Sequence, residues 1–141
     1  MRLAVLDTNV IVSAGIQPGG AHAKLLMDWV LEGEVQLVTS PVVAAKYREV
    51  VRRPKFERYG FPPLWLEFAI EESLQLREPD SWPYLRPDPK DVTSLALARA
   101  SGAWLVTGNL KHFPEAVCGG VRVLSPADYL AHLVGSQIIL E

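Results

Sequence analysis

Residues 88–109 read DPKDVTSLALARASGAWLVTGN and contain the start and end of a helix and the strand that follows it. Asp88-Pro89 has the chemistry of a helix start, because an Asp side chain caps free N–H groups and proline needs none at the first helical position. The apolar spacing predicts a helix over 89–100, ended by Ser101-Gly102. Residues 103–106 are apolar and predict a buried strand, which a polar Thr-Gly-Asn sequence terminates.

The same helix-start chemistry recurs at Ser40-Pro41 and Ser125-Pro126, each time directly after a short apolar run. Runs that are apolar on both faces suit the buried strands of a parallel sheet. Strands that alternate with helices predict a three-layer α/β/α fold with a central, mainly parallel, doubly wound sheet. We expect one domain over residues 1–141, with strands at 3–6, 35–38, 103–106 and 121–124, helices around 25–33 and at 41–53, 64–76, 89–100 and 126–133, and a loop at 77–87.

Composition predicts a soluble, cytoplasmic protein. The chain has 141 residues, a formal net charge of −2 and a single cysteine, Cys118, which cannot form an intramolecular disulfide. No uninterrupted apolar run is long enough to span a membrane. Six of the 14 Lys and Arg residues lie between Lys46 and Arg58. This distribution predicts a local basic patch on a molecule that is not basic overall.

Polar side chains gather where the predicted strands end, which is where ligands bind in open α/β sheets. The first strand ends at Asp7, Thr8 and Asn9, and the strand at 103–106 ends at Thr107 and Asn109. Ser40, Asp88 and Asp91 open helices at the same edge. Carboxylate and neutral oxygen donors suit Mg²⁺ or Mn²⁺. Zinc is a poorer match, because the chain has one Cys and three scattered His residues.

Several segments, taken in order along nearly the whole chain, together resemble the PIN domain. They are LDTNV at 6–10, Ser40-Pro41 with YREV at 47–50 and RPKF at 53–56, DPKD at 88–91 with LALA at 95–98, LVTGNLKHFP at 105–114, and VRVLSPA at 121–127. More narrowly, they resemble the subgroup described as toxins of toxin-antitoxin pairs. The resemblance implies a metal-dependent endonuclease that cuts single-stranded RNA, with acids at the strand ends that hold one or two Mg²⁺ or Mn²⁺ ions.

The resemblance also implies roles for individual residues. Asp7 matches the first acid of the family, and Asn9 matches the polar residue that orients it. The third acid falls at Asp91, or at the next position if the Leu-Ala run is aligned, and Asn109 takes the place of a fourth acid. We therefore expect Asp7, Asn9, Asp91 and Asn109 to be catalytic and Asp7 and Asp91 to be the metal ligands.

The family's second acid falls on Lys46, so the acidic site is expected to be incomplete. A lysine cannot bind a cation, and two like charges at ~4 Å repel by roughly 4 kcal/mol at an effective dielectric of 20. Glu49 lies one helical turn away, and could replace the lost acid only with a shifted metal. We expect the site to be lined by Thr8, Ser40, Lys46, Glu49, Asp88 and Thr107.

Basic residues of the patch, interleaved with Tyr47, Phe56 and Tyr59, predict contacts to single-stranded RNA by phosphate binding and base stacking. A solvated helix face remains the alternative. The RNA-binding candidates are Arg48, Arg52, Arg53, Lys55 and Lys111. Single-stranded RNA, an antitoxin protein and a second copy in a homodimer are the expected partners, and no membrane is expected.

Two other classes of function compete with the nuclease. A weakened PIN fold that holds RNA or protein without cutting is favoured by Lys46 and Asn109. A phosphatase of the haloacid dehalogenase type also begins with an apolar strand and Asp, but its second Asp is missing here because residue 9 is Asn. Nucleotide-binding folds rank lower, since neither GxGxxG nor GxxxxGK[ST] occurs.

Overall fold

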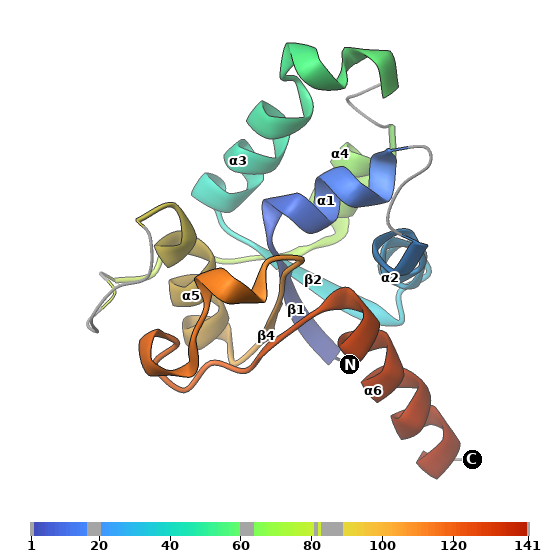
Figure 1. Cartoon of the computed structure of the whole chain (residues 1–141), viewed down its shortest axis with the longest axis vertical. Coiled ribbons are helices and arrows are strands. Elements are labelled where there is room, and N and C mark those ends of the chain that lie inside the picture. Colours follow the sequence, from blue (N-terminus) through green and yellow to red (C-terminus); the bar gives the residue numbers. More distant parts are fainter. Residues whose placement is uncertain (1, 17–20, 60–63, 81, 83–88, 141) are drawn as a thin grey trace.

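The computed structural model describes residues 2–16, 21–59, 64–80, 82 and 89–140, and its centre is a five-stranded sheet (Figure 1). All four strand pairings are parallel, and the strand order is β3-β2-β1-β4-β5. The strands are β1 Arg2–Leu6, β2 Val35–Thr39, β3 Leu74–Gln75, β4 Trp104–Val106 and β5 Val123–Leu124. The chain winds from β1 outward to β3 and then crosses to β4, so the topological switch point lies between β1 and β4.

Helices connect and cover the strands. They are α1 Thr8–Gly15, α2 Ala21–Leu31, α3 Pro41–Val51, α4 Leu64–Glu72, α5 Pro89–Ser101 and α6 Pro126–Leu140, with 3-10 turns at Pro54–Tyr59, Leu110–His112 and Glu115–Val117. Helix α5 contacts β1, β2 and β4, whereas α2 contacts α1, α4 and α6. Right-handed crossovers that run in opposite directions place helices on opposite faces of the sheet. The predicted three-layer α/β/α fold is therefore confirmed.

The central strands are buried on both faces. Ala4, Val5 and Leu6 of β1 and Leu105 and Val106 of β4 are fully buried. Burial of this kind requires the continuous apolar runs seen in the sequence. Polar residues follow where these strands end: Asp7 is partly exposed, whereas Thr107 is still fully buried.

Several boundaries differ from the predicted ones. The predicted helix over 64–76 ends at Glu72, and residues 74–75 instead form β3 at the sheet edge, where Leu76 N donates to Thr39 O at 2.9 Å. Helix α6 continues to Leu140 rather than stopping at 133, and β5 begins at Val123 rather than at 121. A two-residue strand is too short to show alternation, so pairing with β2 alone defines it.

Helix α1 was not predicted, and the residues Asp7, Thr8 and Asn9 are not a simple strand end. Asp7 is the N-cap of α1: it has extended backbone dihedrals, and its Oδ1 accepts from Thr8 N at 2.8 Å.

Asp88, the predicted cap of α5, and most of the predicted 77–87 loop lie outside the described residues. In the part of the chain that the structure describes, no helix combines the length and apolar character needed to cross a bilayer.

Candidate metal centre at the ends of β1 and β4

Thr107 connects the carboxyl ends of the two central strands. Its side chain is fully buried, and its Oγ1 donates to Asp7 Oδ2 at 2.9 Å. The same oxygen accepts from Asn109 N at 3.0 Å. Asp7 N in turn donates to Val106 O at 2.9 Å, which continues the β1–β4 pairing. Backbone and side-chain bonds therefore fix the Asp7 carboxylate against β4.

Asn9 makes a second bridge between α1 and the turn after β4. Its Nδ2 lies 3.4 Å from both Asp7 Oδ2 and Thr107 Oγ1, and its Oδ1 accepts from Gly108 N at 2.9 Å. A Cβ at position 108 would lie 3.3 Å from Asn9 Oδ1, which is tighter than an ordinary contact. The close approach explains why this turn contains glycine. Asn9 therefore lies within hydrogen-bond distance of both the Asp7 carboxylate and the turn after β4.

His112 links Asp91 to Asn109. Asp91 is only 6% exposed, and its Oδ2 lies 3.4 Å from His112 Nδ1. The other ring nitrogen, Nε2, lies 2.9 Å from Asn109 Nδ2. With that amide donating, Nε2 accepts, and a neutral ring carries its proton on Nδ1, facing Asp91. The imidazole thus spans two of the predicted site residues.

A pocket of about 430 Å³ brings most of the predicted residues together. Its lining residues are Asp7, Thr8, Asn9, Val12, Ser13, Lys46, Glu49, Val50, Arg53, Lys55, Phe56, Asp91, Asn109 and His112. The carboxylate of Glu49 is paired with Arg53 at 3.0 Å, one turn along α3. The end of β1 supplies Asp7 and the first turn of α5 supplies Asp91, whereas α3 with the turn after it supplies a basic wall.

Tyr47 lies beneath this pocket rather than on the molecular surface. It is almost fully buried, and its hydroxyl donates to Leu6 O, the last carbonyl of β1. Burial raises the pKa of Tyr47, the Asp7 carboxylate raises it further, and the bond to Leu6 opposes both. A buried ring cannot stack on a base, so its predicted place among RNA-stacking aromatics is wrong. It supports β1 directly behind Asp7.

The donor set suits a cation that is bound partly by water and substrate. Among the described residues, no three His, Cys, Asp or Glu side chains come close enough to hold one metal ion. Mg²⁺ commonly uses one or two carboxylates and completes its shell with waters and phosphate oxygens. Asp7 and Asp91, with the Asn109 amide, fit that pattern. Glu49 does not complete a third acidic position.

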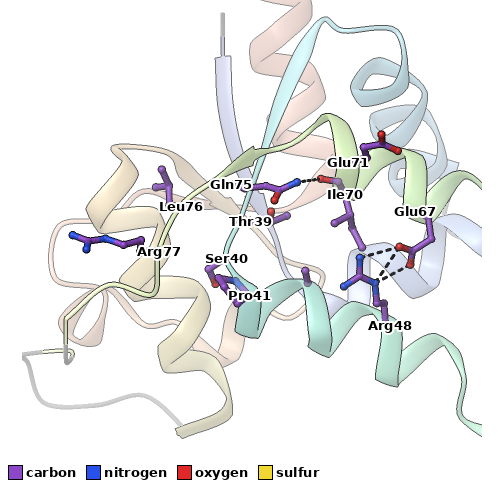
Figure 2. Close-up of a pocket in the computed structure, with 11 residues that line it drawn as sticks. Thr39, Ser40, Pro41, Arg48, Glu67, Ile70, Glu71, Gln75, Leu76 and Arg77 are labelled. Atoms are coloured by element: carbon purple, nitrogen blue, oxygen red, sulfur yellow. Dashed lines mark hydrogen bonds and ion pairs between the residues drawn. The ribbon is translucent and has the colours of Figure 1, made fainter.

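Ser40 and Arg48 line a different pocket, of about 770 Å³, between α3, α4 and the β3 edge (Figure 2). Ser40 Oγ caps α3 by accepting from Val43 N at 3.3 Å. Arg48 makes an ion pair with Glu67 at 2.9 Å. The structure therefore separates both residues from the pocket that contains Asp7.

The predicted RNA-binding residues are likewise divided between the two pockets and the remaining surface. Arg53 and Lys55 line the Asp7 pocket, and Lys55 Nζ lies 5.1 Å from the centre of the Phe56 ring. Arg52 and Lys111 are exposed and line neither pocket. Arg48 is held by Glu67. Two of the five predicted RNA-binding residues are thus next to the acids.

Comparison with protein families gives the same assignment as the motifs. A family model described as the PIN domain matches residues 3–111, which is most of the chain. The chain belongs to the PIN domain family. The matched segment contains Asp7, Asp91 and Asn109, and so covers the acidic pocket. A comparison with curated proteins found no match.

Solved structures with the same fold share little sequence with this PIN domain. VapBC2 from Rickettsia felis, bound to a promoter DNA fragment, matches with a TM-score of 0.59 and 17% identity over 87% of this chain and 98% of that one. DNA-bound VapBC from Salmonella typhimurium gives 0.58 and 18% over 89% and 99%. PAE2754 from Pyrobaculum aerophilum gives 0.57 and 14% over 95% and 90%. At such identities these likenesses show the fold.

Sequence reasoning missed several residues of the PIN-domain pocket. His112 was not among the predicted site residues, because a single histidine in a loop carries little signal. Val12 and Ser13 could not be placed while α1 was unrecognised. The spacing of Asn109 and His112 on one turn after β4 is the signal that could have shown that they face each other.

Proposed function

We propose that this PIN domain is a metal-dependent endonuclease that hydrolyses single-stranded RNA and uses Mg²⁺ or Mn²⁺. The observation that carries the proposal is that Asp7 and Asp91 line one pocket at the β1–β4 switch point. Ligand sites in doubly wound sheets lie at such points. Membership of the PIN domain family agrees with this placement.

The side chains divide the work of the site. Asp7 and Asp91 would hold the cation, which when bound neutralises negative charge on the phosphodiester and activates water. Thr107 and Asn9 hold the Asp7 carboxylate, and His112 positions Asp91 and Asn109. Fixed donors and acceptors avoid the cost of reorganisation during reaction.

RNA would approach along the basic wall of the pocket. Lys55 and Arg53 offer charge for backbone phosphates, and Phe56 offers a ring on which a base can stack. The pairing of Arg53 with Glu49 fixes this guanidinium beside the pocket. We expect binding to weaken as salt concentration rises, because phosphate contacts release counterions.

A catalytically weakened PIN fold that binds RNA or protein without cutting is the second candidate. The observation that favours it is Lys46, which lines the same pocket as Asp7 and Asp91. Its positive charge lowers the affinity of the pocket for a cation. A pocket with weakened metal binding still retains its basic wall.

We also propose a cytoplasmic protein that pairs with an antitoxin and forms a homodimer. The motif resemblance to toxins of toxin-antitoxin pairs supports this partner. Support also comes from the fold, which is similar to the DNA-bound VapBC complexes and to FitAB bound to IR36 DNA. Size measurements with and without a candidate partner would test both assemblies.

Cleavage of a mixed-sequence single-stranded RNA with Mn²⁺, Mg²⁺ or EDTA tests the nuclease. Wild type is compared with Asp7→Asn, which keeps a capping side chain for α1. Asp28→Asn is the matched control, because this exposed carboxylate lies on α2. Metal-dependent cleavage should disappear in Asp7→Asn and persist in Asp28→Asn. Inactive wild type that still binds the RNA would favour the binding module.

A further inference from the structure

A third pocket lies at the amino-terminal ends of β1 and β4, opposite the acidic centre. It has a volume of about 300 Å³ and is lined by Arg2, Leu3, Gly102, Trp104, Tyr129 and His132. Arg2 and Trp104 are the first residues of β1 and β4, whereas Asp7 and Thr107 follow the last residues of the same strands. The two sites therefore face opposite ends of the two central strands.

Arg2 is the charged side chain that lines this pocket. The Arg2 guanidinium has no hydrogen bond or ion pair within the described part of the chain. No Asp or Glu is among the residues that line the pocket, and His132 adds a ring N–H donor. An arginine without a carboxylate partner in a concave site is a receptor for an anion.

Tyr129 supplies a buried donor to the same space. Only 1% of the residue is exposed, yet it lines the pocket. Its hydroxyl makes no hydrogen bond to another described residue and is open to the pocket. Burial raises the pKa of Tyr129 and the Arg2 charge opposes that rise, so this cation acts on the phenol.

The aromatic wall of the pocket is held in place by its neighbours. The Arg122 guanidinium lies 4.3 Å from the centre of the Trp104 ring. The His132 ring lies 4.6 Å from Trp104, and Tyr129 meets Trp104 edge-on at 6.2 Å. The His132 side of this cluster is exposed to solvent. A planar ligand ring can lie against it without rearrangement.

We propose that the Arg2–Trp104–Tyr129–His132 pocket binds a nucleotide phosphate. Arg2 and the Tyr129 hydroxyl hold the phosphate, and the base lies against the Trp104–His132 rings. The volume is at the lower end of small-ligand pockets and exceeds the needs of phosphate alone. The nucleotide is either free or part of an RNA chain. The site uses no residue of the acidic pocket, so it does not depend on nuclease activity.

Calorimetry with adenosine 5′-monophosphate, adenosine, inorganic phosphate and a short 5′-phosphorylated single-stranded RNA tests the proposal. Wild type is compared with Arg2→Gln and Tyr129→Phe. Lys24→Gln is the charge-matched control, because exposed Lys24 lies on α2 and does not line this pocket or the acidic one. Melting temperatures establish that each variant is folded. Chemical shifts of the Trp104 indole N–H and Gly102 N–H locate the ligand.

Loss of a hydrogen bond to a charged group corresponds to about a tenfold weakening or more. Arg2→Gln and Tyr129→Phe should each weaken binding of the monophosphate by about that factor, with Lys24→Gln unchanged, and adenosine should bind more weakly than its phosphate. If the 5′-phosphorylated RNA binds in an Arg2-dependent way and adenosine 5′-monophosphate does not bind, the ligand is a nucleotide within an RNA chain. Equal binding of adenosine and its phosphate, binding that survives Arg2→Gln, or no binding of any probe up to about 5 mM would overturn the proposal.

Discussion

Thr107→Val tests whether a single hydroxyl holds the acidic centre together. Valine has nearly the shape of threonine, so the packing at this fully buried position is kept while the oxygen is lost. The change removes the bond to Asp7 Oδ2 and leaves Asn109 N without its acceptor. A bond to a charged group contributes ~1.5–3 kcal/mol, and the partly buried Asn109 N–H adds part of the ~1–3 kcal/mol that a fully buried unpaired donor costs.

These effects share one oxygen and do not add fully, and the new methyl group recovers part of the loss. We expect the free energy of unfolding to fall by about 2–3 kcal/mol. A domain of this size typically has ~5–15 kcal/mol, so the variant should still fold. Its melting temperature should fall by about 10 °C, at about 4 °C per kcal/mol.

Urea unfolding followed by tryptophan fluorescence measures the stability, and calorimetry with Mn²⁺ measures the effect on the site. Thr107→Ser is the matched control, because it keeps the hydroxyl and loses a methyl group, at a cost of about 1 kcal/mol. The order of stability should be wild type, Thr107→Ser, Thr107→Val. If Thr107→Val is as stable as wild type and binds Mn²⁺ equally well, the hydroxyl does not hold the centre.

Replacing Lys46 by Glu should increase Mn²⁺ affinity at least about tenfold, since a cation becomes a carboxylate beside Asp7 and Asp91. Calorimetry checks this, with exposed Lys24→Glu as the charge-matched control, and equal gains in both variants would contradict it. Alkaline pH should destabilise the fold, because burial raises the pKa of Tyr47 and Tyr129 above the usual value near 10. Native phenols then keep protons that unfolded ones lose, so the free energy of unfolding is full below pH ~10 and falls above it. A flat stability profile from about pH 9 to 11 would refute this.

Local chemistry explains how much of the fold could be predicted from the sequence. Ser-Pro and Asp-Pro steps mark helix starts, and continuous apolar runs mark buried strands, so the order of most elements follows from short segments. Helix α1 was not predicted, because it is short and contains Val10, Ile11 and Val12 in succession. β-Branched residues have low helix propensity and read as strand. The Asp7 cap, not the periodicity, starts this helix.

The candidate site could be predicted only as far as the parallel sheet determines it. Residues at the ends of β1 and β4 meet because those strands are neighbours, and Asp7 and Asn109 both line the acidic pocket. Contacts such as that between Asp91 and His112 join α5 to the turn after β4 and depend on how the helix packs. The direction of each side chain determines which other residues reach the site. Tyr47 points into the core, whereas Lys46 on the same helix lines the pocket.

The two duties of Asp7 limit what mutagenesis of this chain can reveal. One carboxylate oxygen caps helix α1 by accepting from Thr8 N, and the other accepts from the Thr107 hydroxyl at the candidate centre. Alanine at this position would remove a cap, at a cost of about 1 kcal/mol, together with any ligand role. Lost activity could then reflect a frayed helix as well as missing chemistry. An isosteric change such as Asp7→Asn keeps a cap for α1 and removes the carboxylate charge, so it tests the proposed ligand role separately from the helix start.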